Sequence, residues 1–436
     1  MSEPDLSMPT PVNTDSEAVA AGQALSSGLD PFAPGFYDDP YVQYRHLRET
    51  EPVHHSPLGL WFLSRWADCH HVLRLPGTSV NETNSILQER NQALAAAAED
   101  RGLRRSRSIL GTDPPDHTRI RKLMSKAFTP RTIARLEERV AEVVDDRLDV
   151  AAADDGPVDL IAGLAFPLPF QVIHEMLGMP DTAEATHIRG LSQTVTQVLD
   201  PVLAMTQTEA IFAAGEELGT IIDDAVRWKR DHPGDDLLTA LVEAEDDGTT
   251  LSDEELRDNV TLLFLAGHET TVNLIGNGLL ALLRHPDQAA MLRDDPALDA
   301  GAIEELLRYD SPVQFSRRIA LEPFEVAGVQ VETGELVLTG LGASNRDSAK
   351  FGPTAEELDI TRADAHHHIS FGSGIHHCLG AALARLEGRQ TIPRVLRRFP
   401  EVELATDTIE WNGRMVLRGV ANLPVTLGPD SGRASS

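Results

Sequence analysis

The sequence predicts a mainly α-helical protein with a minor β portion, built as one large domain. Apolar residues recur at three- and four-residue spacing, the period of a helix with one buried face, through 132–150, 168–178, 208–229, 253–284, 287–294 and 301–309. Strand signals are short and lie at 52–64, 324–331, 335–341 and 415–426. No internal repeat and no Gly/Ser linker divides the chain, so a single helical domain with small sheets is expected.

Turn residues and composition place the boundaries. Asp113-Pro114-Pro115-Asp116 is a turn that introduces a helix, and Asp231-His232-Pro233-Gly234 ends one. Residues 1–29 are rich in Ser, Ala, Pro and acidic residues and are expected to be a disordered tail. The expected domain covers 30–428, and 429–436 would form a flexible C-terminal tail.

Composition narrows the classes of function. The 436 residues are 41% hydrophobic and 24% charged, and no segment approaches the run of about 20 apolar residues that spans a bilayer. Two cysteines, Cys69 and Cys378, make a disulfide framework implausible and favour a cytoplasmic protein. A net charge of −30 argues against general nucleic-acid binding, which needs a basic surface.

Basic residues gather in two stretches despite this acidic charge. They are Arg104, Arg105, Arg107, Arg119, Arg121, Lys122, Lys126, Arg131 and Arg135, and then Arg385, Arg389, Arg394, Arg397 and Arg398. If the stretches fold together they would form a patch suited to an acidic electron donor. Solvated helix faces explain them equally well, and the sequence leaves both readings open.

The segment 371–380 presents one cysteine in a glycine-punctuated loop ahead of a helix-forming run. Phe371 offers an apolar anchor, Gly374 and Gly380 permit unusual backbone angles or close approaches, and Cys378 precedes the expected helix N-terminus. A helix N-terminus stabilises a thiolate, and a thiolate bound to haem iron favours O–O bond cleavage. The alternatives are a buried structural cysteine and a cluster of Cys378 with neighbouring histidines, whose adjacent side chains cannot all reach one ion.

A second segment, Ala266-Gly267-His268-Glu269-Thr270-Thr271, interrupts a long apolar helix pattern. Glycine costs a helix interior about 1 kcal/mol relative to alanine, and β-branched threonines add to that cost. The Thr270 hydroxyl can bond back to the Ala266 carbonyl, which would open a notch for a small ligand. An ordinary kinked core helix is the alternative.

The pattern Phe-x-x-Gly-x-x-x-Cys-x-Gly resembles the haem-binding signature of the cytochrome P-450 superfamily. The resemblance extends from about Asp30 to Leu427 and includes 345–347 and 423–425. It implies a cytochrome P-450-type helical domain with small β-sheets enclosing haem b. Cys378 would bind the iron, and Phe371, Gly372 and Gly380 would shape the loop.

The resemblance also implies roles outside that loop. Glu269 and Thr270 would be the acid–alcohol pair of an oxygen groove that includes Ala266 and Gly267. Glu305 and Arg308, an acid and a base at i, i+3, would form a buried structural pair. The expected partners of the haem propionates are His117, Arg121, Arg318 and His376, with the adjacent Arg317 as an alternative to Arg318.

The implied function is a soluble, bacterial-type haem-thiolate monooxygenase that inserts one oxygen atom from O2 by hydroxylation or epoxidation. Electrons would come from an acidic ferredoxin and its NAD(P)H-dependent reductase, and the largely hydrophobic substrate would be a secondary metabolite, terpenoid or steroid. A peroxygenase and a non-catalytic haem sensor compete with this reading. The expected pocket residues are Leu262, Leu265, Val313, Phe315 and Val416.

Overall fold

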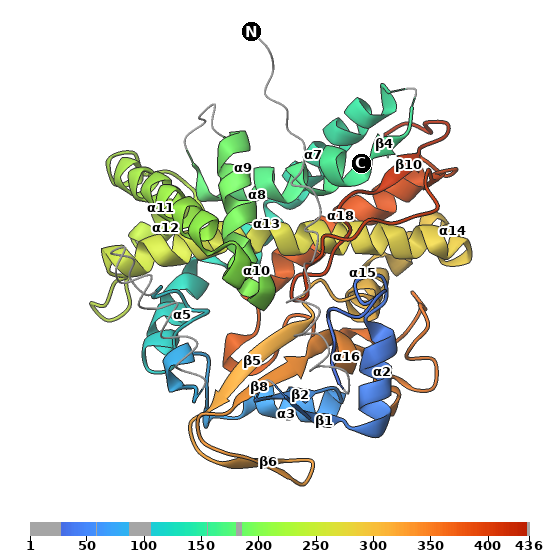
Figure 1. Ribbon diagram of the computed structural model, residues 1–436. Helices are drawn as coiled ribbons and strands as arrows, with labels where there is room; N and C mark the ends of the chain where they lie inside the picture. The colour runs from blue at the N-terminus through green and yellow to red at the C-terminus, as the bar shows by residue number, and fades with distance from the viewer. Residues whose placement is uncertain (1–27, 58, 87–105, 155, 180–184, 434–436) are drawn as a thin grey trace.

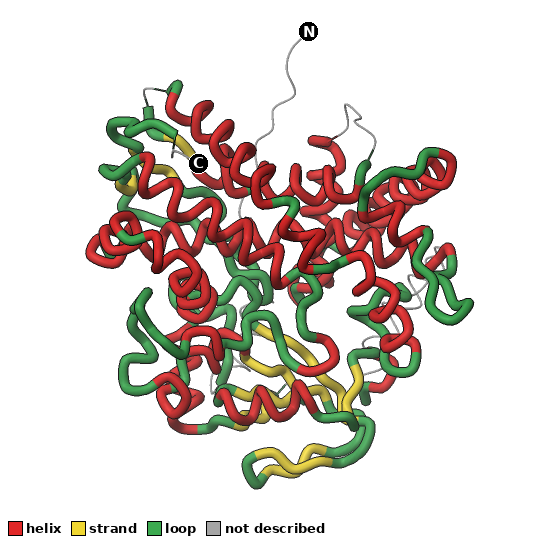
Figure 2. The backbone as a smooth tube through the Cα atoms, turned by 180° about the vertical axis from the view of Figure 1, so that it is seen from behind, coloured by secondary structure: helices red, strands yellow, loops and turns green. Residues whose placement is uncertain are grey.

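The computed structural model describes residues 28–57, 59–86, 106–154, 156–179 and 185–433. Most of the expected N-terminal tail lies outside this part of the chain. Helices form a broad layer above a smaller β portion, and the two-stranded ribbon of β6 and β7 projects at the end opposite the helices (Figure 1, Figure 2). Among the described residues, no helix has both the length and the apolarity to cross a membrane.

The helices follow the chain from the blue to the red end of Figure 1. They are α2 (Tyr41–Thr50), α3 (Trp66–Arg74), α5 (Asp116–Ala127), α6 (Pro130–Ala134), α7 (Glu137–Ala152), α8 (Pro167–Leu177), α9 (Ala185–Val195), α10 (Pro201–Thr206), α11 (Thr208–Asp231), α12 (Leu237–Val242), α13 (Asp253–Arg284), α14 (Pro286–Asp294), α15 (Asp299–Tyr309), α16 (Leu341–Asn345), α17 (Ser348–Phe351) and α18 (Ala381–Arg398). Short helical turns used below are η3 (Thr196–Leu199) and η6 (Gly374–His376).

The strands form three sheets. The strands are β1 (Val53–Ser56), β2 (Leu60–Leu63), β3 (Thr78–Ser79), β4 (Val158–Asp159), β5 (Phe315–Ala320), β6 (Phe324–Val326), β7 (Val329–Val331), β8 (Leu336–Gly340), β9 (Glu403–Leu404) and β10 (Pro424–Thr426). The largest sheet has the order β1-β2-β8-β5-β3, in which only β2 and β8 pair in parallel. The order β4-β10-β9 makes a second sheet.

Helix α13 runs through the middle of the molecule and positions the site (Figure 1). Its N-terminus has a capping box, in which the Ser252 hydroxyl accepts from the Glu255 amide and the Glu255 carboxylate accepts from the Ser252 amide. Near its other end, a β-carbon on Gly278 would lie 2.9 Å from Ile392 of α18. This close approach fixes α13 against the helix that follows the cysteine loop.

Much of the predicted fold is confirmed. The six predicted helical segments are helical, although 132–150 is divided between α6 and α7. Four strands were not predicted: the two-residue strands β3, β4 and β9, and the longer β5, whose Arg317-Arg318 pair hides the β-pattern. Of the named strands, 415–426 contains only β10. In the expected C-terminal tail, Asp430 pairs with Arg398 at 2.7 Å and Arg433 pairs with Asp146 at 2.9 Å, so the start of that tail is anchored.

Candidate active site

The cysteine loop is held by backbone contacts before it enters α18. The Cys378 amide donates to the Phe371 carbonyl at 2.9 Å, and the Arg385 guanidinium lies 4.5 Å from the centre of the Phe371 ring. Gly374 has a φ of +74°, and a β-carbon there would lie 2.6 Å from the Leu73 carbonyl oxygen of α3, so the loop needs glycine at this position. Gly372 also has a left-handed φ, of +69°, whereas Gly380 at −85° does not.

The environment of Cys378 combines burial with donors. Part of the residue is accessible, yet the surrounding protein raises the pKa of its thiol, and the backbone amides of Gly380 and Ala381 with the Arg121 charge oppose that rise. The helix N-terminus therefore favours the thiolate as predicted, but burial is the larger effect. A coordinated metal ion deprotonates such a thiol outright.

Four cationic or donor side chains converge beside the loop. The rings of His117 and His376 are 4.2 Å apart, Arg318 is 4% exposed, and the Arg121 guanidinium donates to the His377 carbonyl at 2.6 Å. Burial, with Arg318 and His117 nearby, lowers the pKa of His376 to about 3. Burial also lowers the pKa of Arg318 to about 10.

No ion pair with a described acid neutralises Arg318, although the Asp113 charge acts on both Arg318 and His117. Neither nitrogen of the buried His117 ring has a hydrogen-bond partner, and Arg318 forms no ion pair with any described acid. Its guanidinium donates only to the Ser316 hydroxyl and the Arg317 carbonyl, at 3.1 and 2.7 Å. Buried cations and unpaired donors require an anionic ligand, so these residues fit the two carboxylates of a haem.

Arg317 and Arg318 point to opposite environments, as adjacent strand residues do. Arg317 forms an ion pair with Glu82, and its side chain is 47% exposed. Arg318 is buried beside His117 and His376, and its positive charge helps to lower the pKa values of both imidazoles. The geometry therefore favours Arg318 as the partner of a buried anion.

The hydrogen bond predicted on α13 is present. The Thr270 hydroxyl donates to the Ala266 carbonyl at 2.9 Å, and Ala266 is exposed although the helix around it is largely buried. The helix itself runs without a break through this turn. A β-carbon on Gly267 would make only ordinary contact with Ile173, at 3.4 Å.

Glu269 lies in the same turn but is not free. It is 8% exposed and forms an ion pair with Arg414, a residue of the C-terminal loop between β9 and β10. Burial raises the pKa of Glu269, while the Arg414 charge and the Thr196 hydroxyl oppose the rise. Its neighbour His268 is fully buried, and burial lowers the pKa of that imidazole to about 4.

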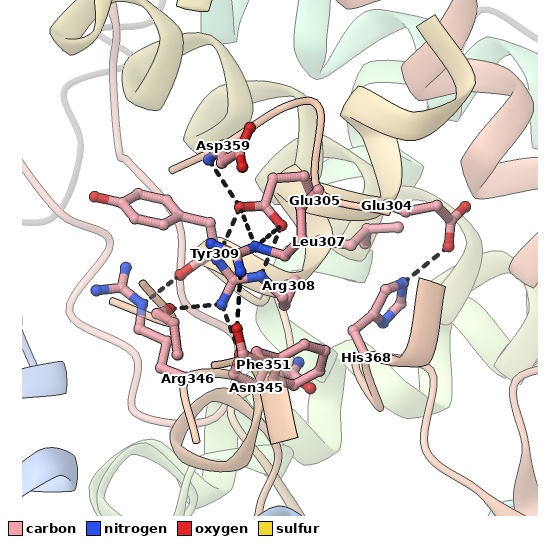
Figure 3. A network of polar contacts seen from close by, with 12 residues as sticks. Glu304, Glu305, Leu307, Arg308, Tyr309, Asn345, Arg346, Phe351, Asp359 and His368 are labelled. Carbon is pink, nitrogen blue, oxygen red and sulfur yellow. Dashed lines mark hydrogen bonds and ion pairs between the residues drawn. The ribbon is translucent and has the colours of Figure 1, made fainter. Parts of the chain in front are cut away.

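Glu305 and Arg308 form a fully buried pair behind the loop (Figure 3). The Arg308 guanidinium donates to Glu305 at 2.7 and 2.8 Å and to the carbonyls of Asn345, Ala355 and Glu357 at 2.7–2.9 Å. The Asp359 amide donates to Glu305 at 2.9 Å. Every part of the pair is satisfied, as expected for a structural role.

Four of the five expected pocket residues are half-buried. Leu262 and Leu265 lie on α13, and Val313 and Val416 lie on other segments of the chain. Phe315 as a pocket residue is wrong. It is 5% exposed, and its ring packs 5.8 Å from both Tyr44 and Phe62 in an aromatic core, because it lies on the inner face of β5.

The two basic stretches are mostly neutralised. Arg104 and Arg105 lie outside the described residues, and among the remaining members only Arg121 and Arg131 lack an acidic partner. The pairs are Arg107–Glu254, Arg119–Glu255, Lys122–Asp246, Lys126–Asp246, Arg135–Asp235, Arg385–Glu304, Arg389–Glu137, Arg394–Asp145, Arg397–Asp299 and Arg398–Asp430. Solvated, ion-paired helix faces therefore explain most of these residues.

Two residues of interest were missed from the sequence. Arg414 carries no local signal, because its partner lies 145 positions away. Glu387 of α18 is 1% exposed, and neither of its carboxylate oxygens has a well-formed hydrogen bond. The nearby Thr271 hydroxyl of α13 stabilises the carboxylate only partly. Burial raises the pKa of Glu387 to about 8. A glutamate within an apolar helix face was the one available clue.

Comparison with known proteins decides the family. The family model described as Cytochrome P-450 matches residues 83–418. The chain belongs to the cytochrome P-450 family. It is similar to cytochrome P-450 107B1 of Saccharopolyspora erythraea, with 42% identity over 90% of this chain and 97% of that protein. A vitamin D(3) 25-hydroxylase of Pseudonocardia autotrophica is 41% identical over 92% of this chain and 97% of the relative.

Solved structures agree with these relatives. The Bacillus subtilis bacillaene polyketide synthase cytochrome P-450 PksS has a TM-score of 0.82 and 36% identity, covering 91% of this chain and 99% of that one. The predicted fold class is thereby confirmed. This cytochrome P-450 is an oxidoreductase of the monooxygenase type, and its cofactor is haem b.

Proposed function

We propose that this cytochrome P-450 hydroxylates or epoxidises a largely hydrophobic secondary metabolite, terpenoid or steroid. One observation carries the site assignment: a thiol at a helix N-terminus lies beside a buried arginine that has no ion pair with a described acid and a buried histidine ring without a hydrogen-bond partner. Cys378 would bind the iron, and His117, Arg121, Arg318 and His376 would bind the propionates. When bound, haem supplies dioxygen activation, and its thiolate ligand favours O–O bond cleavage.

Proton delivery is the task we assign to α13. The Thr270 hydroxyl, bonded back to the exposed Ala266, can hold a proton donor in place beside this turn. Glu269, one residue earlier, is the acid that would replenish the proton. This pair supports a monooxygenase over a peroxygenase, because hydrogen peroxide already carries the protons that the pair would deliver.

A hydrophobic substrate is supported by the partly exposed Leu262 and Leu265 and by Val313 and Val416. These side chains would exclude water from the substrate. One relative is named a vitamin D(3) 25-hydroxylase and another is named for polyketide biosynthesis, and both names agree with this proposal. We also propose a cytoplasmic location, since Cys69 and Cys378 are both free.

An acidic ferredoxin with its NAD(P)H-dependent reductase is the electron donor we propose. Ile375 of the cysteine loop is 52% exposed, and Arg74 near it has no acidic partner among the described residues. An exposed apolar side chain beside an unpaired cation suits an acidic protein surface. The rest of the basic residues contribute little because they are ion-paired.

The absorbance of the reduced protein with carbon monoxide tests the ligand assignment. Wild-type protein is expected to give the strongly red-shifted Soret band of thiolate-ligated haem, and Cys378→Ser is expected to lose it. Cys69→Ala is the matched control, because Cys69 is a buried structural thiol whose pKa burial raises. A thiolate band that persists in Cys378→Ser would refute the assignment.

Replacement of each threonine on α13 tests proton delivery. Thr270→Ala should bind haem normally but divert reducing equivalents to hydrogen peroxide, because the Thr270 hydroxyl is gone. Thr271→Ala is the control, since Thr271 faces Glu387 and is 2% exposed. Peroxide and product are measured per NAD(P)H consumed. Equal coupling in wild type and Thr270→Ala would contradict the proposed role.

A further inference from the structure

The acid of α13 is held by a residue that belongs to a distant part of the chain. Arg414 pairs with one Glu269 oxygen, and the same guanidinium donates to the Thr196 hydroxyl at 3.1 Å and to the Gln193 carbonyl at 3.2 Å. The side chains of Arg414 and Glu269 are 11% and 10% exposed. One guanidinium thus joins α13, the end of α9 and the start of η3.

The backbone beside Arg414 is tied to the same segment. The Met415 amide donates to the Asp200 carboxylate at 2.7 Å, directly after η3. The Arg414 amide donates to the Asn412 side chain at 3.1 Å, and that side chain also donates to the Leu417 carbonyl at 2.8 Å. The C-terminal loop therefore presents Arg414 from a braced turn, and the position of 193–200 depends on that turn.

The two oxygens of Glu269 have different surroundings. One is paired with Arg414, and the other is buried without a hydrogen-bond partner, although the Thr196 hydroxyl lies close enough to stabilise the carboxylate. A carboxylate held at one oxygen keeps a fixed orientation, and its second oxygen remains able to take up or release a proton. The structural acid Glu305 differs, because both of its carboxylate oxygens have hydrogen-bond partners.

We propose that Arg414 is a positioning residue that holds the Glu269 carboxylate against the α9–η3 turn and thereby couples proton delivery to the placement of that turn. The proposal rests on the proton-delivery role of Glu269 given under the proposed function. It assigns Arg414 no contact with haem or substrate. It requires that loss of the guanidinium change both the ionisation of Glu269 and its coupling to residues 193–200.

Other charged groups near Glu269 do not replace Arg414. His268 is buried, and its pKa of about 4 keeps it neutral at neutral pH. Arg189 of α9 lies over the Phe166 ring, 3.4 Å from its centre, and acts on His268. Asp200 accepts from the Met415 amide, and Glu387 contacts α13 through Thr271 from the opposite helix. Arg414 is the only described cation in contact with Glu269.

Infrared titration of the ferric, substrate-free haem protein tests the proposal directly. The carboxyl band of Glu269 is identified by its loss in Glu269→Gln, and its midpoint pH is compared in wild type, Arg414→Met and Arg414→Lys. An opposite charge in contact lowers a carboxyl pKa by about 1–3 units, so Arg414→Met should raise the midpoint by at least about one unit. Arg414→Lys should restore most of that shift. An unchanged midpoint in Arg414→Met would overturn the proposal.

The link to the α9–η3 turn needs its own variant. Thr196→Val keeps the side-chain shape but removes the hydroxyl that contacts Arg414, and it should move the Glu269 midpoint in the same direction as Arg414→Met by a smaller amount. Thr194→Val is the control, because that exposed hydroxyl donates only to the Gly190 carbonyl within α9, at 3.0 Å. A midpoint shift in Arg414→Met without any in Thr196→Val would overturn the coupling to the turn.

The proposal and the proposed function fail in different ways. The titration reads Glu269 without substrate or electron donor, so it does not depend on turnover. If the midpoint shifts as expected while Thr270→Ala stays fully coupled, Arg414 positions Glu269 but the assigned proton-delivery role is wrong. If Thr270→Ala is uncoupled and the midpoint does not move, the role stands and the Arg414 proposal fails.

Discussion

Two buried clusters, one around Arg308 and one around Arg318, differ in how the protein neutralises their charge. Behind the loop, Arg308 pairs with Glu305 and three backbone carbonyls, so no charge or donor remains unmatched (Figure 3). Beside the loop, Arg318 forms no ion pair with a described acid, although the Asp113 charge acts on it, and neither nitrogen of the buried His117 ring has a hydrogen-bond partner. The first cluster is complete within the chain, and we propose that an anionic ligand completes the second.

The difference teaches how to separate scaffold from site among buried charges. Removing an ion from water costs several kcal/mol, and a protein offsets that cost with a partner. Where the chain supplies the partner, the cluster stabilises the fold. Where the chain supplies no partner, the desolvation cost is offset only when a ligand such as the haem carboxylates binds. An unpaired buried charge therefore indicates a binding site.

The largest effect should come from breaking the matched cluster. Arg308→Met removes the cation and leaves the buried carboxylate of Glu305 with Arg362, at 3.3 Å, and the Asp359 amide as its remaining partners. We expect the free energy of unfolding to fall by about 3–5 kcal/mol, or folded haem protein to be absent. Urea unfolding and the yield of haem protein measure this.

An exposed pair with the same i, i+3 spacing is the control for that variant. Arg139 and Glu142 are 3.0 Å apart with side chains 42% and 54% exposed, and Glu142→Gln should change stability by less than about 0.5 kcal/mol. Comparable losses in the two variants would contradict the distinction between buried and exposed pairs.

A smaller effect, confined to haem, should follow from the unmatched cluster. Arg318→Leu removes one hydrogen-bonded cation from the propionates and should speed haem dissociation about tenfold to hundredfold, since a hydrogen bond to a charged group contributes about 1.5–3 kcal/mol. Transfer of haem to an excess of a haem-scavenging apoprotein measures the rate. Arg317→Leu is the adjacent control, because Arg317 pairs with Glu82 at the surface, and faster loss in Arg317→Leu than in Arg318→Leu would reverse the assignment.

The third effect depends on pH and concerns a buried acid, Glu387. Burial raises its pKa from about 4.5 to about 8, so the folded state binds a proton that the unfolded state releases. Its contribution to stability is therefore fully present below pH about 4.5 and is lost as the pH rises to about 8. Glu387→Gln should match wild type near pH 4.5 and become relatively more stable up to about pH 8. Urea unfolding at several pH values measures this. If the stabilities of wild type and Glu387→Gln changed in parallel with pH, the raised pKa of Glu387 would be contradicted.

Local patterns in the sequence determined the parts of this protein that depend on neighbours along the chain. The helical period gave the helices, glycine positions marked the cysteine loop, and the Thr270 bond to Ala266 spans only four residues. The pair of Glu305 and Arg308 was equally local, at i, i+3. The motif identity of Cys378 needed no tertiary information, because its glycines and following helix are contiguous in the chain.

Tertiary structure decided what depends on contacts between distant segments. Strand β5 escaped prediction, so the sequence could not say that Arg318 faces inward, Arg317 outward, and Phe315 into an aromatic core. Arg414 reaches Glu269 across 145 positions, and most arginines near the loop meet acids from other helices. Residue spacing fixes backbone hydrogen bonds, but the partner of a buried charge is fixed only when the helices and sheet close around it.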